Sequence, residues 1–121
     1  MRQFDHEKLS VYQAAIKFVA WSSELLNDVP RGLAVHNQID RATTSIPLNI
    51  AEGNGKYTPA DRCRYLDNAR GSALECAACL DVLVARGRIA RSVAEEGKSV
   101  LIEIVSMLVG LIRANSETRQ A

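Results

Sequence analysis

One stretch of the sequence decides the fold: Gln38-Ile39-Asp40-Arg41-Ala42-Thr43-Thr44-Ser45-Ile46-Pro47-Leu48-Asn49-Ile50-Ala51-Glu52-Gly53. Its apolar residues recur at spacings of three and four, the period of an α-helix with one buried face: Ile39, Ala42, Ile46 and Ile50. Polar residues repeat at helical spacing beside them and share a second face: Gln38, Ser45, Asn49 and Glu52. A helix packs with one apolar face, so an ordered polar stripe indicates a polar network or a binding surface. We expect Gly53-Asn54-Gly55 to end the helix, because both residue types tolerate the left-handed conformation at a C-cap.

Three further segments carry helical periodicity, and no alternating strand pattern competes with them. The predicted helices cover about residues 10–27, 33–53, 58–85 and 92–114. Pro30 favours a turn after the first helix, whereas Thr58 and Pro59 suit the cap and the first position of the third. Pro47 falls inside the second helix, where we expect a kink. Short connections between long helices favour an all-α, antiparallel up-down-up-down four-helix bundle that occupies residues 1–121 as a single domain.

The fourth predicted helix is apolar on more than one face. Between residues 100 and 112, only Glu103, Ser106 and Gly110 are not apolar. Each helix of an isolated bundle should expose one face to water. A second buried face therefore indicates a homo-oligomer, with the fourth helix and Trp21 or Phe18 of the first helix in the contact.

Composition excludes several classes of protein. No run of about 18 apolar residues is present, which excludes a membrane-spanning helix. The charged start of the sequence lacks the apolar core of a signal peptide. Three cysteines, an odd number, fit a reducing compartment. We therefore expect a cytoplasmic, bacterial-type protein.

The motifs that could carry catalytic or metal chemistry do not meet the requirements of that chemistry. Cys76 and Cys79 have the spacing of a redox pair but fall in the middle of a predicted helix, so we interpret them as small buried residues. Residues 53–58 lack the spacing and the Lys-Ser/Thr pair of a phosphate-binding loop. Glu52 and Glu75 could form a carboxylate pair, but no nucleophile accompanies them. We expect no enzyme activity, no metal and no cofactor.

The polar stripe of the second helix is expected to meet Arg64, Ser72 and Glu75 of the third. Two interpretations are open: a structural network that fixes helix register and subunit geometry, or a surface that contacts a ligand or nucleic acid. The network would contain six residues: Gln38, Ser45, Asn49, Glu52, Ser72 and Glu75.

Charge gives a weaker indication of function. The net charge is only +1, although residues 31–91 contain nine basic and six acidic residues. Repeated around a ring of subunits, such an excess becomes a multivalent surface for a phosphate backbone. Few aromatic residues flank the arginines to stack bases. The candidate nucleic-acid-binding residues are Arg41, Lys56, Arg62, Arg64, Arg70, Arg86, Arg88 and Arg91.

A family resemblance rests on a signature at the end of the second helix, Asn49-Ile50-Ala51-Glu52-Gly53-Asn54-Gly55-Lys56, and on the pairs before it, Gln38-Ile39, Arg41-Ala42 and Ser45-Ile46. Further matches lie in residues 4–13 and 64–75, so the likeness extends over about residues 4–112. On these residues the chain resembles the four-helix-bundle family of large-subunit (23S) ribosomal RNA intervening-sequence proteins. The accessory protein of diversity-generating retroelements is a relative of that family. Asp40 departs from the family pattern, which often has a second basic residue before Arg41.

The resemblance implies a homopentamer and a non-catalytic accessory protein. The partners it implies are the backbone of RNA or DNA, a ribonucleoprotein, or a protein such as a reverse transcriptase. The alternative is an oligomeric protein-interaction scaffold without affinity for nucleic acid. Salt distinguishes the two, because phosphate binding weakens steeply as salt rises, whereas apolar docking need not.

Overall fold

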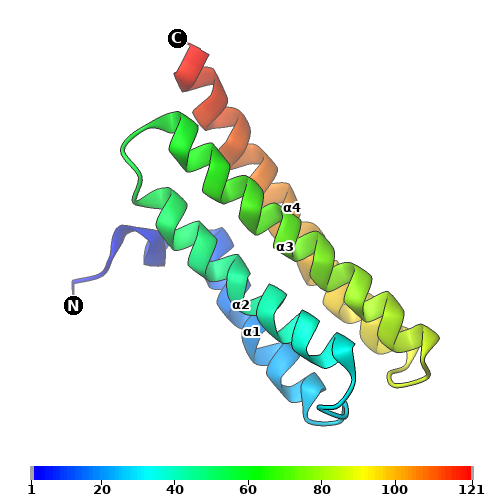
Figure 1. The fold of residues 1–121 in the computed structure, drawn as a ribbon. Helices are drawn as coiled ribbons and strands as arrows, with labels where there is room; N and C mark the ends of the chain where they lie inside the picture. Colours follow the sequence, from blue (N-terminus) through cyan, green and yellow to red (C-terminus); the bar gives the residue numbers. More distant parts are fainter. Residues whose placement is uncertain (1, 121) are drawn as a thin grey trace.

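The computed structural model describes the backbone of residues 2–120 and the side chains of residues 2–116. A short 3-10 helix, η1 (Asp5–Lys8), precedes four α-helices: α1 (Ser10–Leu26), α2 (Ala34–Asn54), α3 (Pro59–Ala85) and α4 (Arg91–Gln120). α1 packs against α2, α2 against α3, α3 against α4, and α4 against α1, so each helix lies between two others (Figure 1). Within the described residues the chain is all-α and has no strand.

The helix bounds agree with the predicted ranges except at the C-terminus. α1, α2 and α3 begin and end within one residue of the predicted positions. α4 continues to Gln120, whereas the prediction ended it near Ala114. α2 runs through Pro47, whose ring is buried. None of the helices formed by the described residues contains an uninterrupted apolar stretch of the length that a membrane span requires.

The predicted apolar stripes form the core of the bundle. All four stripe positions of α2 are 5% exposed or less: Ile39, Ala42, Ile46 and Ile50. α3 contributes the predicted positions Leu66, Ala69, Ala73, Cys76, Leu80 and Leu83. Phe18 is 1% exposed and belongs to the same core, so the prediction that it could contribute to a subunit contact is wrong. Trp21 is half-buried, and its Nε1 donates a hydrogen bond of 3.1 Å to Glu96.

A buried polar cluster inside this core was not predicted. Ser22 of α1 and Thr43 of α2 are 1% and 3% exposed. Thr43 Oγ1 donates a hydrogen bond of 3.4 Å to Ser22 Oγ and lies 3.5 Å from Cys76 Sγ of α3. Because buried hydroxyl groups are costly without partners, this contact favours one relative position of the three helices.

The connection between α2 and α3 is ordered by its cap and by a close helix contact. The Asp61 amide donates to Thr58 Oγ1 at 3.2 Å, which confirms Thr58 as the N-cap of α3. α2 ends at Asn54 with Gly55 as its C-cap, within the predicted Gly53-Asn54-Gly55 segment. The expected left-handed conformation is absent, because Gly55 has a φ of −85° and Gly53 lies inside the helix. Among the described residues, only Gly87, after α3, has a positive φ. Gly53 instead permits close approach to α3, since a β-carbon there would be 3.0 Å from Tyr65 Cβ.

Candidate nucleic-acid interface

The predicted polar stripe lines a groove between α2 and α3. The groove has a volume of about 480 Å³ and is lined by Gln38, Arg41, Ala42, Ser45, Ser72 and Glu75. Four of these belong to the predicted six-residue network, and Arg41 is one of the predicted basic residues. The sequence therefore identified side chains that the fold brings together across two helices.

Ser45 is the centre of the hydrogen bonding in this groove. Asn49 Nδ2 donates to the Ser45 carbonyl at 2.9 Å and to Ser45 Oγ at 2.8 Å. Ser72 Oγ of α3 donates to the same Ser45 hydroxyl at 2.9 Å. The three side chains are part-buried, and they join α2 to α3 through one shared acceptor.

The two carboxylates of the predicted network lie outside this hydrogen-bonded group. Glu52 and Glu75 are exposed. Within the described residues neither side chain makes an ion pair or an internal hydrogen bond. Arg64 of α3 was also expected to meet the polar stripe of α2. It pairs instead with Asp61 of its own helix at 3.7 Å. The hydrogen-bonded network therefore contains fewer residues than the six that were predicted.

The predicted basic residues divide into three groups along the bundle. Lys56, Arg62 and Arg64 lie at the α2–α3 connection and the start of α3. A second group lies at the α3–α4 connection, which is at the other end of α3 (Figure 1): Arg86, Arg88 and Arg91. Arg41 and Arg70 lie within α2 and α3. The fold does not gather all eight residues on one surface.

The groups differ in how far neighbouring carboxylates neutralise them. Arg70 pairs with Asp67 at 3.1 Å, and Arg64 pairs with Asp61. By contrast, the α3–α4 connection carries three exposed arginines, Arg86, Arg88 and Arg91. Within the described chain none of the three forms an ion pair. Their charges remain available to an anionic partner.

Two tyrosines lie among the basic residues of the α2–α3 connection. Lys56 Nζ is 4.9 Å and Arg64 Cζ is 5.1 Å from the centroid of the Tyr65 ring, which are cation–π contacts. Tyr57 is 96% exposed. Few aromatic residues flank the arginines, as predicted, but Tyr65 contacts Arg64, and Tyr57 adds an exposed ring beside Lys56 at this end of α3. The signal was present in the sequence, where Tyr57 follows Lys56 and Tyr65 follows Arg64.

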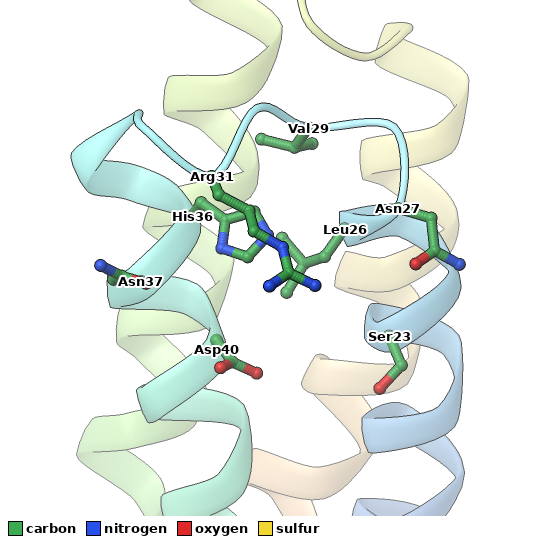
Figure 2. Close-up of a pocket in the computed structure, with 8 residues that line it drawn as sticks. All are labelled: Ser23, Leu26, Asn27, Val29, Arg31, His36, Asn37 and Asp40. Carbon is green, nitrogen blue, oxygen red and sulfur yellow. The ribbon is translucent and has the colours of Figure 1, made fainter.

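A polar pocket at the α1–α2 turn was also missed. Its volume is about 390 Å³, and its lining consists of Ser23, Leu26, Asn27, Val29, Arg31, His36, Asn37 and Asp40. Figure 2 shows the Arg31 side chain beside the His36 ring, with its guanidinium turned toward Asp40 and Ser23. His36 Nδ1 is buried and has no hydrogen-bond partner among the residues that the structure describes. The lining combines one arginine with one aspartate, so its charge favours neither a cation nor an anion.

The cysteines are buried thiols, as predicted for Cys76 and Cys79. Both are free and lie within α3, at 0% and 6% exposure. Burial raises the pKa of the Cys76 thiol to about 11, and the hydrogen bond with Thr43 offsets only part of that rise. Burial also raises the pKa of Cys79. A redox cysteine needs the opposite shift. No group of three or more potential metal ligands occurs in the part of the chain that the structure describes.

The fold and the signature at the end of α2 define a class of protein. The chain belongs to the family of 23S rRNA-intervening sequence proteins, whose family model matches residues 7–110. It is similar to a crystal structure of a protein of unknown function from the S23 ribosomal protein family of Bacteroides thetaiotaomicron. The two are 26% identical with a TM-score of 0.79, covering 84% of this chain and 97% of that chain. A search of curated proteins gave no match.

Proposed function

We propose that this chain is a non-catalytic, oligomeric accessory protein that binds the phosphate backbone of RNA or DNA, alone or within a ribonucleoprotein. The observation that carries the proposal is the α3–α4 connection, where Arg86, Arg88 and Arg91 are exposed and unpaired within the described chain. Three free guanidinium groups on one short connection suit phosphate oxygens, which they bind without reading the bases. The family description, which names the intervening sequence of 23S rRNA, supports an RNA-related role.

Assembly is part of the proposal, because three arginines on one subunit bind weakly. We expect an antiparallel bundle that assembles as a cyclic homopentamer, so that five copies of the arginine group act together. The contact surface would include the apolar groove between α3 and α4, about 480 Å³ in volume. Two of its lining residues are large, apolar and exposed on a single subunit, since Ile102 is 69% and Leu74 is 49% exposed. The net charge of only +1 means that charge repulsion between subunits is small. The cytoplasm is the expected compartment, since free thiols stay reduced there.

The proposal excludes catalysis by this chain itself. The thiols of Cys76 and Cys79 have raised pKa values. Glu75, the carboxylate that lines the α2–α3 groove, forms no hydrogen bond within the described residues with the serine hydroxyls of the groove, so it does not activate either as a nucleophile. Chemistry would then be done by a partner, and a protein such as a reverse transcriptase is a candidate.

The test is binding of the assembled protein to fluorescently labelled structured RNA and duplex DNA over a range of salt. Changing Arg86, Arg88 and Arg91 together to Gln should weaken binding by about tenfold or more and reduce the dependence of log affinity on log salt by about 2–3. The matched control changes Arg2, Lys8 and Lys17 to Gln, which removes the same charge from exposed positions elsewhere. An equal loss in both variants, or no binding by the wild type at low salt, would contradict the proposal.

The alternative is an oligomeric protein-interaction scaffold, and one observation favours it. The α3–α4 groove is mostly apolar, with Leu74, Ile102 and Val105 among its lining residues. Docking of a protein on such a surface depends little on salt. Partner binding that persists at high salt in the arginine variant would support the scaffold.

A further inference from the structure

The α2–α3 connection exposes one aromatic ring almost completely. Tyr57 is 96% exposed, whereas the other two tyrosines, Tyr12 and Tyr65, are half-buried and pack against other side chains. The Tyr57 ring therefore contributes almost nothing to the packing of the bundle. Its position in the connection calls for a role outside the fold.

The backbone on both sides of Tyr57 is held in place. On one side, the Lys56 amide donates to the Gly53 carbonyl at 3.2 Å, and Arg62 Nε donates to the Lys56 carbonyl at 2.8 Å. On the other side, Thr58 caps α3. A ring presented from an ordered backbone loses only its own side-chain freedom when it binds, so it binds at a lower entropic cost than a ring on a mobile loop.

The surroundings of Tyr57 are cationic rather than apolar. Lys56, Arg62 and Arg64 lie within eight residues of one another in the sequence and around the same connection. Of these three, only Arg64 forms an ion pair with another described residue, Asp61. Sites for single-stranded nucleic acid combine such charges with aromatic rings, on which bases stack. A protein-docking site would instead surround the ring with exposed apolar side chains. Large exposed apolar residues such as Leu74 and Ile102 lie elsewhere, in the groove between α3 and α4.

The geometry also favours an unpaired strand over a duplex. Inside a duplex both faces of each base are covered by neighbouring bases, so a protruding tyrosine can stack there only by unstacking a base step, which costs a few kcal/mol. In a single strand or a loop the bases can separate and lie on an aromatic ring.

We propose that the α2–α3 connection is a binding site for single-stranded RNA or DNA, in which a base stacks on Tyr57 while Lys56 and Arg62 contact the adjacent phosphates. The proposal rests on the proposed function and adds the class of strand. The site is separate from the three arginines at the α3–α4 connection, because α3 has 27 residues and is therefore about 40 Å long. A structured RNA could present a duplex to one end of the subunit and an unpaired segment to the other.

The experiment compares a labelled single strand of about 12 nucleotides, near the span of single-strand sites, with a duplex of the same sequence. Binding to each is measured by fluorescence anisotropy with the full-length protein. Tyr57→Ala should weaken single-strand binding by about tenfold, because stacking of one base contributes about 1–3 kcal/mol. Duplex binding should stay unchanged. Tyr57→Phe should bind the single strand like the wild type, since it keeps the ring. Phe4→Ala is the matched control, because Phe4 is 73% exposed at another site.

The outcomes separate this inference from the proposed function. Unchanged single-strand binding by Tyr57→Ala would overturn the inference and make a protein partner the better explanation of Tyr57. An equal loss of single-strand and duplex binding, or a loss in Tyr57→Phe as large as in Tyr57→Ala, would also overturn it. If the wild type binds the duplex but not the single strand, this inference is wrong and the proposed function stands. If the wild type binds neither the single strand nor the duplex, both proposals are wrong.

Discussion

Gly53 of α2 lies directly against Tyr65 of α3. A β-carbon on Gly53 would be 3.0 Å from Tyr65 Cβ and 3.3 Å from the Arg62 carbonyl oxygen. Both atoms are fixed by the backbone of α3, so rotation of a side chain cannot relieve the contact. The absence of a side chain at Gly53 therefore brings the end of α2 onto α3, where Lys56 reaches the Tyr65 ring.

Gly53→Ala should destabilise the protein by about 1–2 kcal/mol. Overpacking at a contact that cannot relax costs about 1–3 kcal/mol, and the better helix propensity of alanine offsets part of that cost. Gly71→Ala is the matched control, because a β-carbon on Gly71, also within a helix, would meet nothing within 4 Å. This control should be stabilised by about 0.5–1 kcal/mol. Urea unfolding followed by circular dichroism measures both, and equal stabilisation of the two variants would refute the close-contact role of Gly53.

Asn49→Ala should reduce stability without weakening nucleic-acid binding by the folded protein. The change removes the two hydrogen bonds from Asn49 to Ser45, which we expect to cost about 1–2 kcal/mol in a part-buried site. The same change at Asn68, an exposed residue of α3, is the control and should cost little. Unfolding and binding are measured on the same preparations. A variant of normal stability that binds nucleic acid poorly would show that the groove is a ligand site rather than a structural network.

The sequence predicted the bundle because helical periodicity depends on local spacing alone. Ile39, Ile46 and Ile50 are spaced so that they share one helix face, and any helix formed there must bury them. The bond from Asn49 to Ser45 follows from the same spacing, since residues four apart are neighbours on a helix. These features can be predicted without knowing which helix packs against the one that carries them.

Features that depend on the distance between helices could not be predicted in this way. The role of Gly53 was misread because a glycine at a helix end suggests a C-cap, whereas the contact with Tyr65 exists only once α3 is in place. The contact of Thr43 with Ser22 and Cys76 likewise joins three helices. Glu52 has the correct spacing for the polar stripe but is exposed, because it lies two turns beyond Ser45, whose hydroxyl accepts the bond from α3.

Ile102→Glu should dissociate the proposed oligomer. The side chain is 69% exposed on a single subunit, so the substitution removes little packing within the bundle. In a contact between subunits the same position would place an unpaired carboxylate in an apolar surface, which is strongly unfavourable. Sedimentation should show the mass of several chains for the wild type and of one chain for the variant. Ser92→Glu, which adds the same charge at an exposed position near the start of α4, should keep the wild-type mass. A wild type with the mass of one chain would refute the oligomer.

Stability should fall at high pH because of Cys76. Its thiol has a pKa of about 11 in the folded protein, against an ordinary value of 9.0, since burial disfavours the thiolate. An unfolded chain therefore releases this proton at lower pH than the folded chain does. The contribution of the protonated Cys76 thiol to the free energy of unfolding is complete below pH 9 and is lost as the pH rises from 9.0 toward 11.

Cys76→Ser isolates this contribution from the other groups that titrate at high pH. Serine does not ionise in this range and can keep a hydrogen bond with Thr43, so the stability of the variant should decline less steeply between pH 9.0 and 10 than that of the wild type. The measurement is the free energy of unfolding in urea at each pH, under reducing conditions. Mass spectrometry after brief alkylation at pH 8 gives an independent check, because only the thiolate reacts and Cys76 should be modified far more slowly in the folded protein than in urea. Parallel pH profiles for the two proteins, together with rapid alkylation of folded Cys76, would mean that the thiol is accessible and that the core around Thr43 opens readily.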